Sequence, residues 1–203
     1  MKKLLISIFA FSFFVNAWSQ QKFLGPINSV FAGEKIAWVY PTFDRDTATL
    51  TLLKNYVSEV FNYFKREGWI LIPDSTALSN PLSDYGLLIY GTIESNLLLK
   101  HYKSLFPFKI ENDIIYADKE YKDKNTRFIT CLPNPHNPTQ GIIIYTGMAN
   151  KNIVGINGVY HGPTDFVVFI HPSGDDLRQA YSETDNLSQG FYDKTDSKWK
   201  FAK

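Results

Sequence analysis

The sequence predicts an α/β protein with three layers: a mixed, mostly parallel sheet, helices on both of its faces, and one antiparallel hairpin. Short, fully apolar segments alternate with segments of helical periodicity through much of the chain. Such continuous apolar strands are typical of parallel sheets that are covered on both faces. The hydrophobic fraction of 44% and the aromatic fraction of 16% are large enough for a substantial buried core.

The clearest predicted element is a helix over residues 47–67. Its apolar residues recur at helical spacing and form one face: Leu50, Leu53, Val57, Val60, Phe61 and Phe64. Asp44 or Asp46 can cap the start of this helix, and Gly68 is a typical residue for its C-terminal end.

The other elements are expected in chain order around this helix. Apolar runs predict strands at 35–40, 69–73, 86–91, 126–132, 141–145 and 165–170. Shorter helices are expected at 97–106 and 150–160, and the stretch before residue 85 is either a loop or a short helix around 76–84. Residues 108–117 have the pattern of a hairpin that turns at Glu111-Asn112-Asp113. Residues 133–138 contain three prolines and predict an irregular loop, because proline has no N–H to donate to a sheet.

The first twenty residues have the layout of a secretory signal peptide. Lys2 and Lys3 precede an apolar run from Leu4 to Val15, and a short polar end follows. A run of about a dozen residues is shorter than the roughly 20 that span a bilayer. We therefore expect a secreted or periplasmic protein, with an uncleaved anchor as the alternative.

The remaining chain is expected to form one domain. Residues 21–33 predict a lead-in segment without clear periodicity, and residues 34–203 predict a single α/β domain whose polar tail begins at about residue 172. The only cysteine, Cys131, lies in an apolar stretch and is interpreted as a buried packing residue. With 21 basic against 20 acidic residues and no basic block, the sequence disfavours nucleic-acid binding.

Two segments that resemble each other predict a ligand site. Each consists of a strand, a glycine near the strand end and the start of a helix, and ligands of open α/β sheets bind at such strand ends. Helix starts also offer unpaired N–H groups. The residues expected to line a polar or anionic pocket are Thr92, Ser95, Asn96, Gly147 and Asn150.

Motifs for catalysis, metals and cofactors are missing from the sequence. It contains no G-x-S-x-G pentapeptide, no H-E-x-x-H motif and no dinucleotide fingerprint, so no catalytic residue, metal site or cofactor is predicted. Two alternatives stay open. His161, Asp165 and His171 could assemble a metal site, and Asp44 with Asp46 could act as paired carboxylates, although helix capping explains these two aspartates better.

A longer pattern runs over roughly residues 85–200. It includes Gly91-Thr92 with Asn96, the segment Pro133-Asn134-Pro135-His136-Asn137-Pro138, and Asp165-Phe166-Val167-Val168-Phe169. This pattern resembles an accessory α/β module attached to secreted prolyl-oligopeptidase-like and esterase-like hydrolases. In that family the activity lies in a separate domain with a nucleophile elbow, which this sequence lacks. The resemblance implies a free-standing accessory module that inherits no catalytic residue.

The sequence therefore favours a secreted, non-catalytic binding or interaction module over an enzyme. Its expected partner is a small polar or anionic ligand or a secreted protein. A small secreted hydrolase with an unrecognised site is one alternative, and it would need His161 or His171 within hydrogen-bond reach of a Ser, Thr or Asp side chain. A structural envelope protein is another, and it would need a large apolar contact surface.

Overall fold

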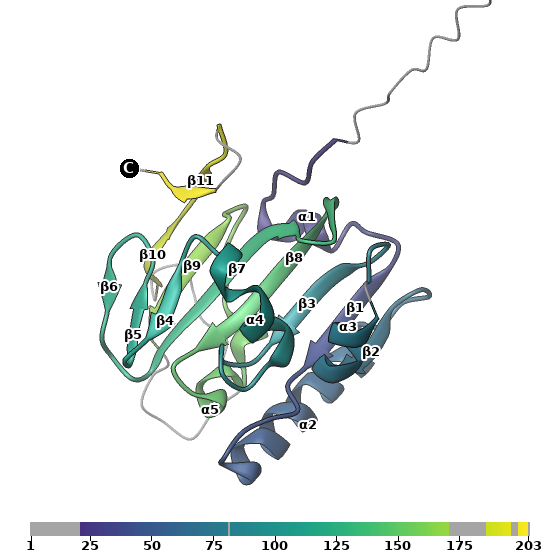
Figure 1. The fold of residues 1–203 in the computed structure, drawn as a ribbon, viewed down its shortest axis with the longest axis horizontal. Coiled ribbons are helices and arrows are strands. Elements are labelled where there is room, and N and C mark those ends of the chain that lie inside the picture. Colours follow the sequence, from purple (N-terminus) through teal and green to yellow (C-terminus); the bar gives the residue numbers. More distant parts are fainter. Residues whose placement is uncertain (1–20, 81, 171–185, 196–198, 203) are drawn as a thin grey trace, which may run out of the picture.

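The computed structural model of the protein describes residues 21–80, 82–170, 186–195 and 199–202. The described residues form a seven-stranded sheet of order β10-β9-β7-β8-β3-β1-β2, a three-stranded sheet β4-β5-β6 and a two-stranded ribbon β11-β12 (Figure 1). The strands are β1 (Ile36–Tyr40), β2 (Ile70–Pro73), β3 (Gly86–Tyr90), β4 (Lys109–Glu111), β5 (Ile114–Tyr116), β6 (Glu120–Tyr121), β7 (Thr126–Asn134), β8 (Asn137–Gly147), β9 (Phe166–Ile170), β10 (Asn186–Gly190), β11 (Tyr192–Asp193) and β12 (Lys200–Phe201). The helices are α1 (Ile27–Val30), α2 (Thr47–Phe64), α3 (Asp74–Ser79), α4 (Leu97–Tyr102) and α5 (Asn150–Ile153), with 3-10 turns η1 (Lys103–Leu105) and η2 (Ile156–Gly158). The predicted signal peptide and residues 171–185 of the predicted tail lie outside the described residues.

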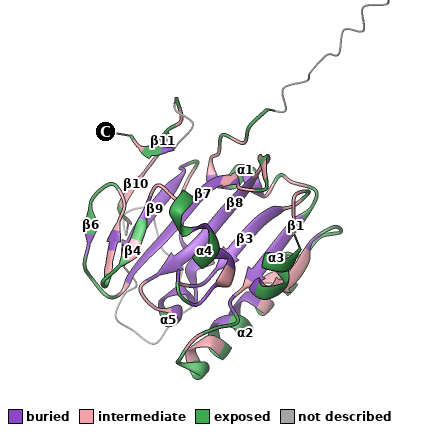
Figure 2. Cartoon of the chain, in the orientation of Figure 1, coloured by how far each residue is buried: buried purple, intermediate pink, exposed green. Residues whose placement is uncertain are grey.

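One half of the main sheet is parallel. Strands β2, β1, β3 and β8 run in the same direction, with Trp38 opposite Leu88 and Leu88 opposite Ile143. Every residue of β3 is buried, as the purple strands of Figure 2 illustrate. Burial on both faces explains why these strands are apolar at consecutive positions. The structure thus confirms an α/β fold built on a mixed sheet.

The other half of the main sheet is antiparallel, so the expectation of a mostly parallel sheet is wrong. Strand β7 pairs antiparallel with both β8 and β9, and β10 pairs antiparallel with β9. The described strands of this sheet therefore make three parallel and three antiparallel pairings. The proline-rich segment 133–138, expected as an irregular loop, instead continues both strands and joins them in a tight turn.

Asparagine side chains supply hydrogen bonds around the prolines of this turn. Asn134 Nδ2 donates to the carbonyl oxygen of Tyr85 at 3.2 Å, and Asn134 Oδ1 accepts from the N–H of His136 at 3.0 Å. Asn137 Nδ2 donates to the carbonyl oxygen of Ser83 at 2.8 Å. Buried backbone groups need such partners, so these amides allow a proline-rich sequence to remain within the sheet.

Helix α2 begins where the sequence predicts. Asp46 is its N-cap and accepts a hydrogen bond from the N–H of Thr49 at 3.0 Å. Leu53 and Val57 are fully buried on its inner face. The helix ends before Gly68, which lies in the turn to β2 with a φ of 82°.

The helix predicted for residues 150–160 is interrupted. Gly155 adopts a left-handed conformation with a φ of 83°, which separates α5 from the 3-10 turn η2. The interruption turns Asn157 toward the core. Its Oδ1 accepts a hydrogen bond from the hydroxyl of Tyr56 at 2.9 Å, and its Nδ2 donates to the hydroxyl of Tyr90 at 2.9 Å.

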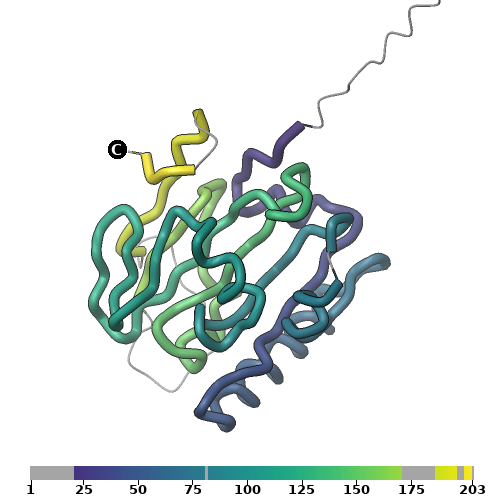
Figure 3. Tube along the Cα trace, viewed as in Figure 1, coloured from purple at the N-terminus to yellow at the C-terminus, as the bar shows by residue number. Residues whose placement is uncertain are grey.

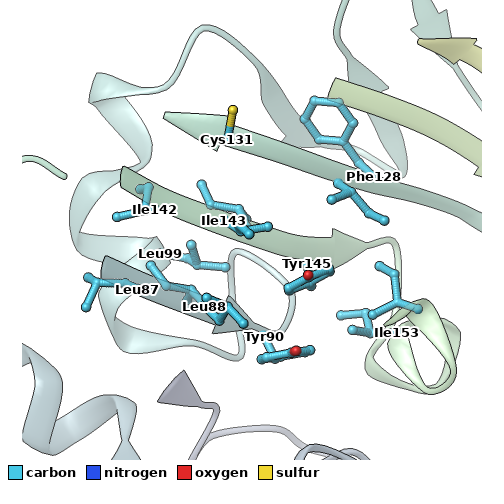
Figure 4. Close-up of a cluster of buried hydrophobic side chains, with 14 of the residues drawn as sticks. Leu87, Leu88, Tyr90, Leu99, Phe128, Cys131, Ile142, Ile143, Tyr145 and Ile153 are labelled. Carbon is cyan, nitrogen blue, oxygen red and sulfur yellow. The ribbon is translucent and has the colours of Figure 1, made fainter. Parts of the chain in front are cut away.

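A column of aromatic rings crosses the parallel strands. Trp38 of β1 stacks on Tyr90 of β3 with centroids 5.7 Å apart, and Tyr90 stacks on Tyr145 of β8 at 4.6 Å. Figure 4 shows the two tyrosines side by side, near Ile153 of α5. Phe61 of α2 meets Trp38 edge-on at 5.9 Å. Each such pair adds about 0.5–1.5 kcal/mol beyond its buried area, so the column stabilises the order of these strands.

The predicted lead-in segment, residues 21–33, packs onto the sheet through α1. Ile27 is fully buried, and α1 contacts β7 and β8. Figure 3 shows the described start of the chain, in purple, and its end, in yellow, at the same end of the molecule. There Phe23 stacks on Trp199 with centroids 6.5 Å apart. No helix in the described ranges is long and apolar enough to cross a membrane.

The C-terminal ribbon is tied to the sheet through Asp165. The carboxylate of Asp165 is fully buried, lies 2.6 Å from Lys194 Nζ and accepts a hydrogen bond from the N–H of Tyr192 at 3.0 Å. Lys194 also donates to the carbonyl oxygen of Leu24. Cys131 is buried beside this pair, and burial raises the pKa of its thiol well above the usual value. A thiol in that state is a packing group rather than a nucleophile.

Candidate functional site

The loops that follow β1, β3 and β8 meet at one end of the main sheet. The chain leaves β1 through α2 and leaves β3 through α4, and ligands of open α/β sheets bind where such connections diverge. Of the predicted site residues, the structure brings Thr92, Ser95 and Asn150 into direct contact here. Ser95 Oγ donates to Asn150 Oδ1 at 2.8 Å, and the N–H of Thr92 donates to the same oxygen at 3.2 Å.

Asp44 completes this group and belongs to the loop after β1. Asn150 Nδ2 donates to Asp44 Oδ2 at 2.5 Å, which links the ends of β1 and β8. Both Asn150 and Ser95 are almost fully buried. The side-chain amide of Asn150 therefore joins three loops from three different strands, and we call Asp44, Thr92, Ser95 and Asn150 the loop latch.

Asn96 has a separate role as the N-cap of α4. Its Oδ1 accepts hydrogen bonds from the N–H groups of Leu98 and Leu99, and its Nδ2 donates to the carbonyl oxygen of Tyr90. The N–H of Leu97 donates to a carboxylate oxygen of the buried Asp74 at 2.7 Å. The first amides of α4 are thus bound within the protein.

Because of these hydrogen bonds, only some of the predicted residues line a cavity. Ser95, Asn96 and Asn150 bind one another or neighbouring backbone groups, whereas Thr92 and Gly147 line a cavity of about 540 Å³. Volumes of roughly 300–1,000 Å³ are typical of small-ligand sites. We call this space the strand-end cavity, because Thr92 lies just after the carboxyl end of β3 and Gly147 is the last residue of β8.

Another part of the lining of the strand-end cavity comes from the segment that leads into the small sheet. Phe106 and Phe108 line it, and their rings are stacked with centroids 5.1 Å apart and an interplanar angle of 7°. Phe108 in turn meets Phe128 of β7 edge-on at 4.9 Å. The aromatic wall is therefore held in place by the core of the sheet, which favours a preformed site.

Charges of both signs surround the cavity. The lining includes two ammonium groups and three carboxylates: Lys103, Lys109, Glu94, Glu111 and Asp113. Glu94 also pairs with Lys100 at 2.7 Å, and this hydrogen bond lowers the pKa of Glu94. A lining with both signs fits a zwitterionic or neutral polar ligand better than a strong anion.

A second cavity of about 660 Å³ lies beyond Phe106, which lines both spaces. Its walls include the proline-rich turn and the C-terminal ribbon, through Pro133, Pro135 and Trp199. The indole nitrogen of Trp199 is buried and has no hydrogen-bond partner among the described residues. Lys22 and Lys200 also line this cavity.

The histidines show no catalytic partner in the part of the chain that the structure describes. His161 Nδ1 lies 3.1 Å from the backbone oxygen of Gly162, and burial lowers the pKa of His161. His136 Nε2 is hydrogen-bonded to the hydroxyl of Tyr102. His171, considered for catalysis and for metal binding, lies outside the described residues. Within those residues, no group of three or more His, Cys, Asp or Glu side chains is placed to hold a metal ion.

The two aspartates after β1 have structural partners. Asp46 caps α2, and hydrogen bonds from the hydroxyl and the N–H of Thr49 lower the pKa of Asp46. Asp44 Oδ1 accepts from the N–H of Asp46 at 2.9 Å, while its Oδ2 accepts from Asn150. Each carboxylate is thus engaged in positioning a loop or a helix.

Most residues that line the strand-end cavity are not predicted from the sequence as site residues. The sequence predicts that Phe106 and Phe108 are core aromatic residues and that Lys109 belongs to a hairpin. The only available signal was the hairpin itself, and its position next to the strand ends depends on tertiary packing. No protein-family model matches this chain, and no curated protein is similar to it.

Proposed function

We propose that this protein is a non-catalytic binding module whose ligand occupies the strand-end cavity. The observation that carries the proposal is the cavity itself. It has about 540 Å³ of space at the carboxyl ends of two parallel strands, and its lining includes Thr92, Gly147 and a stacked aromatic pair.

The chemistry of the lining supports binding rather than turnover. The half-buried Phe106, stacked on the buried Phe108, offers an apolar surface, and Lys103, Lys109 and Glu111 offer charges for orientation. No histidine or cysteine of the described residues lines the cavity. We propose a ligand with an apolar body and polar groups of both signs, which includes amino-acid and peptide derivatives.

We also propose that the protein is exported and has three layers. The pattern of residues 1–20 supports export. The contacts between α2 and α5, and separately between α3 and α4, support helices on both faces of the sheet. The resemblance to accessory modules of secreted hydrolases agrees with a binding role, because such modules carry no nucleophile elbow.

The test is a binding screen with a matched pair of variants. The probes are the twenty N-acetyl amino-acid amides. Their binding is detected by changes in the ¹H–¹⁵N chemical shifts of the protein. Met148→Trp fills the cavity, since Met148 lines it, whereas Leu52→Trp adds the same ring on the exposed side of α2. Binding that is kept by Leu52→Trp and lost by Met148→Trp supports the proposal. Binding unaffected by Met148→Trp, or no binding of any probe, contradicts it.

A further inference from the structure

The free edge of β4 borders the strand-end cavity. In the small sheet the strand order is β4-β5-β6, so among the described residues β4 has a partner strand on one side only. Six consecutive residues, Phe108 to Asp113, line the cavity. Successive side chains of a strand point to opposite faces. An unbroken run of lining residues therefore means that the cavity extends along the edge of the strand and not over one face.

The backbone N–H and C=O groups of Ile110 point outward at this free edge of β4. Asn112 and Asp113 have φ values of 52° and 57°, the conformation of a tight two-residue hairpin turn. That turn is closed by the hydrogen-bonded pair Glu111 and Ile114, and hydrogen-bonded pairs alternate with unbonded ones along an antiparallel hairpin. Ile110, which lies opposite Ile115, therefore directs its N–H and C=O away from β5. Among the backbone hydrogen bonds that join separate parts of the described chain, none involves Ile110.

Resting on the proposed function, we infer that the ligand of the strand-end cavity is an extended peptide segment that adds to β4 as an antiparallel strand. Main-chain hydrogen bonds to a free sheet edge are a recurring mode of peptide recognition. One extended residue fills about 160 Å³ at the usual strand and sheet spacings. A cavity of about 540 Å³ thus holds about three residues, which matches the three residues of β4.

The charges along β4 specify the peptide further. Lys109 and Glu111 are exposed and lie on the same face of the strand, with Ile110 on the other. Opposite charges at directly facing positions stabilise a strand pair. An antiparallel peptide therefore places a basic residue opposite Glu111, an apolar residue opposite Ile110 and an acidic residue opposite Lys109. The sequence pattern is basic–apolar–acidic, read from the N-terminus of the peptide.

The probe is the pentapeptide acetyl-Val-Lys-Val-Glu-Val-amide, titrated into the full-length protein. In the bound state the N–H of its central valine donates to the carbonyl oxygen of Ile110, while the N–H of its lysine faces away. N-methylation of the central valine is expected to weaken binding at least about tenfold, and N-methylation of the lysine is the matched control, with a change within about twofold. The peptide is also expected to slow hydrogen exchange of the Ile110 amide. The charge-swapped peptide acetyl-Val-Glu-Val-Lys-Val-amide binds about threefold or more weakly at low salt.

Four outcomes overturn the inference. Equal affinity of the two N-methylated peptides shows that the edge of β4 is not used. If hydrogen exchange of the Ile110 amide becomes slower at higher protein concentration in the absence of peptide, the edge of β4 binds a second copy of the chain. If the N-acetyl amino-acid amides bind in the cavity and the pentapeptide does not, the proposed binding function holds and the proposed peptide ligand is wrong. If neither class of probe binds, both proposals fail.

Discussion

Ser95 Oγ donates a hydrogen bond of 2.8 Å to Asn150 Oδ1, across 55 positions of the chain. Through this bond the loop after β3 is joined to the loop after β8, and Asn150 continues the link to Asp44 after β1. The loop latch thus fixes one wall of the strand-end cavity, because Thr92 belongs to it and also lines the cavity. Rigid support of this kind favours a preformed ligand site.

Replacing Asn150 is expected to loosen the loop latch. Asn150→Ala removes the oxygen that accepts from the Ser95 hydroxyl and from the N–H of Thr92, together with the amide that donates to Asp44, while the N–H of Thr92 keeps Ser95 Oγ as an acceptor at 2.9 Å. The loss of these bonds costs about 1–3 kcal/mol in the free energy of unfolding. Urea denaturation measures this value. Asn28→Ala, which removes an exposed side-chain bond to Gly162, is the control and changes stability by less than about 0.5 kcal/mol. An Asn150→Ala protein as stable as this control would show that the latch has no structural role.

Gly91 is expected to tolerate no side chain. Its φ is 132°, and an added Cβ would lie 3.0 Å from Ser95 Oγ and 3.2 Å from Pro41 Cβ. Gly91→Ala combines backbone strain with overpacking and should cost about 1–3 kcal/mol. Gly33→Ala provides the comparison, since the nearest atom to its Cβ lies at 3.3 Å and its φ is not positive. Equal thermal midpoints for the two variants would refute the close packing at Gly91.

The Asp165–Lys194 pair is expected to anchor the C-terminal ribbon. Lys194→Met leaves a fully buried carboxylate without its cation, and the side chain of Lys194 is itself only 22% exposed. The expected loss is about 2–4 kcal/mol, somewhat below that of a fully buried pair. Lys100→Met breaks the exposed pair with Glu94 and should cost less than about 1 kcal/mol.

A double variant separates loss of the pair from loss of packing. Asp165→Asn combined with Lys194→Met should be less destabilised than the sum of the two single variants, because neither charge is then left alone. Urea denaturation of the three variants gives the loss in the free energy of unfolding for each. If the loss in the double variant equals the sum of the losses in the two single variants, the two groups do not interact.

His161 is expected to make stability depend on pH. Burial lowers the pKa of His161, whereas a histidine of the unfolded chain titrates near about 6.5. The unfolded state therefore binds more protons below pH ~6.5, and the free energy of unfolding falls as the pH falls through that value. The measurement compares the native protein with His161→Gln at pH 7.5 and 5.5. The variant should lose less stability over this interval, and an identical loss would show that His161 does not contribute.

The strand ends of the parallel half could be predicted from sequence. Fully apolar runs such as β3 identify buried strands, and parallel strands bring their carboxyl ends to one edge of a sheet. Ser95 and Asn150, both expected at these strand ends, are joined by a hydrogen bond. Sequence patterns do not show that these two side chains bind each other, so that of the five predicted residues Thr92 and Gly147 line the cavity.

The antiparallel half could not be predicted because its determinants lie far apart in the chain. Prolines in residues 133–138 predict a loop, yet Asn134 and Asn137 donate to backbone oxygens of the segment before β3, which keeps that stretch within the sheet. Phe106 and Phe108 have no local pattern that distinguishes a cavity wall from the core. Their role follows from the position of the small sheet beside the ends of β3 and β8.

The most direct test of a ligand site at the ends of β3 and β8 is the map of ¹H–¹⁵N chemical-shift changes that a bound probe produces in the protein. Binding in the strand-end cavity predicts saturable changes at Thr92, Gly147 and Ile110, from three separate elements, and their loss in Met148→Trp. Changes confined to other residues, or changes that persist in Met148→Trp, would contradict a ligand site at the ends of β3 and β8.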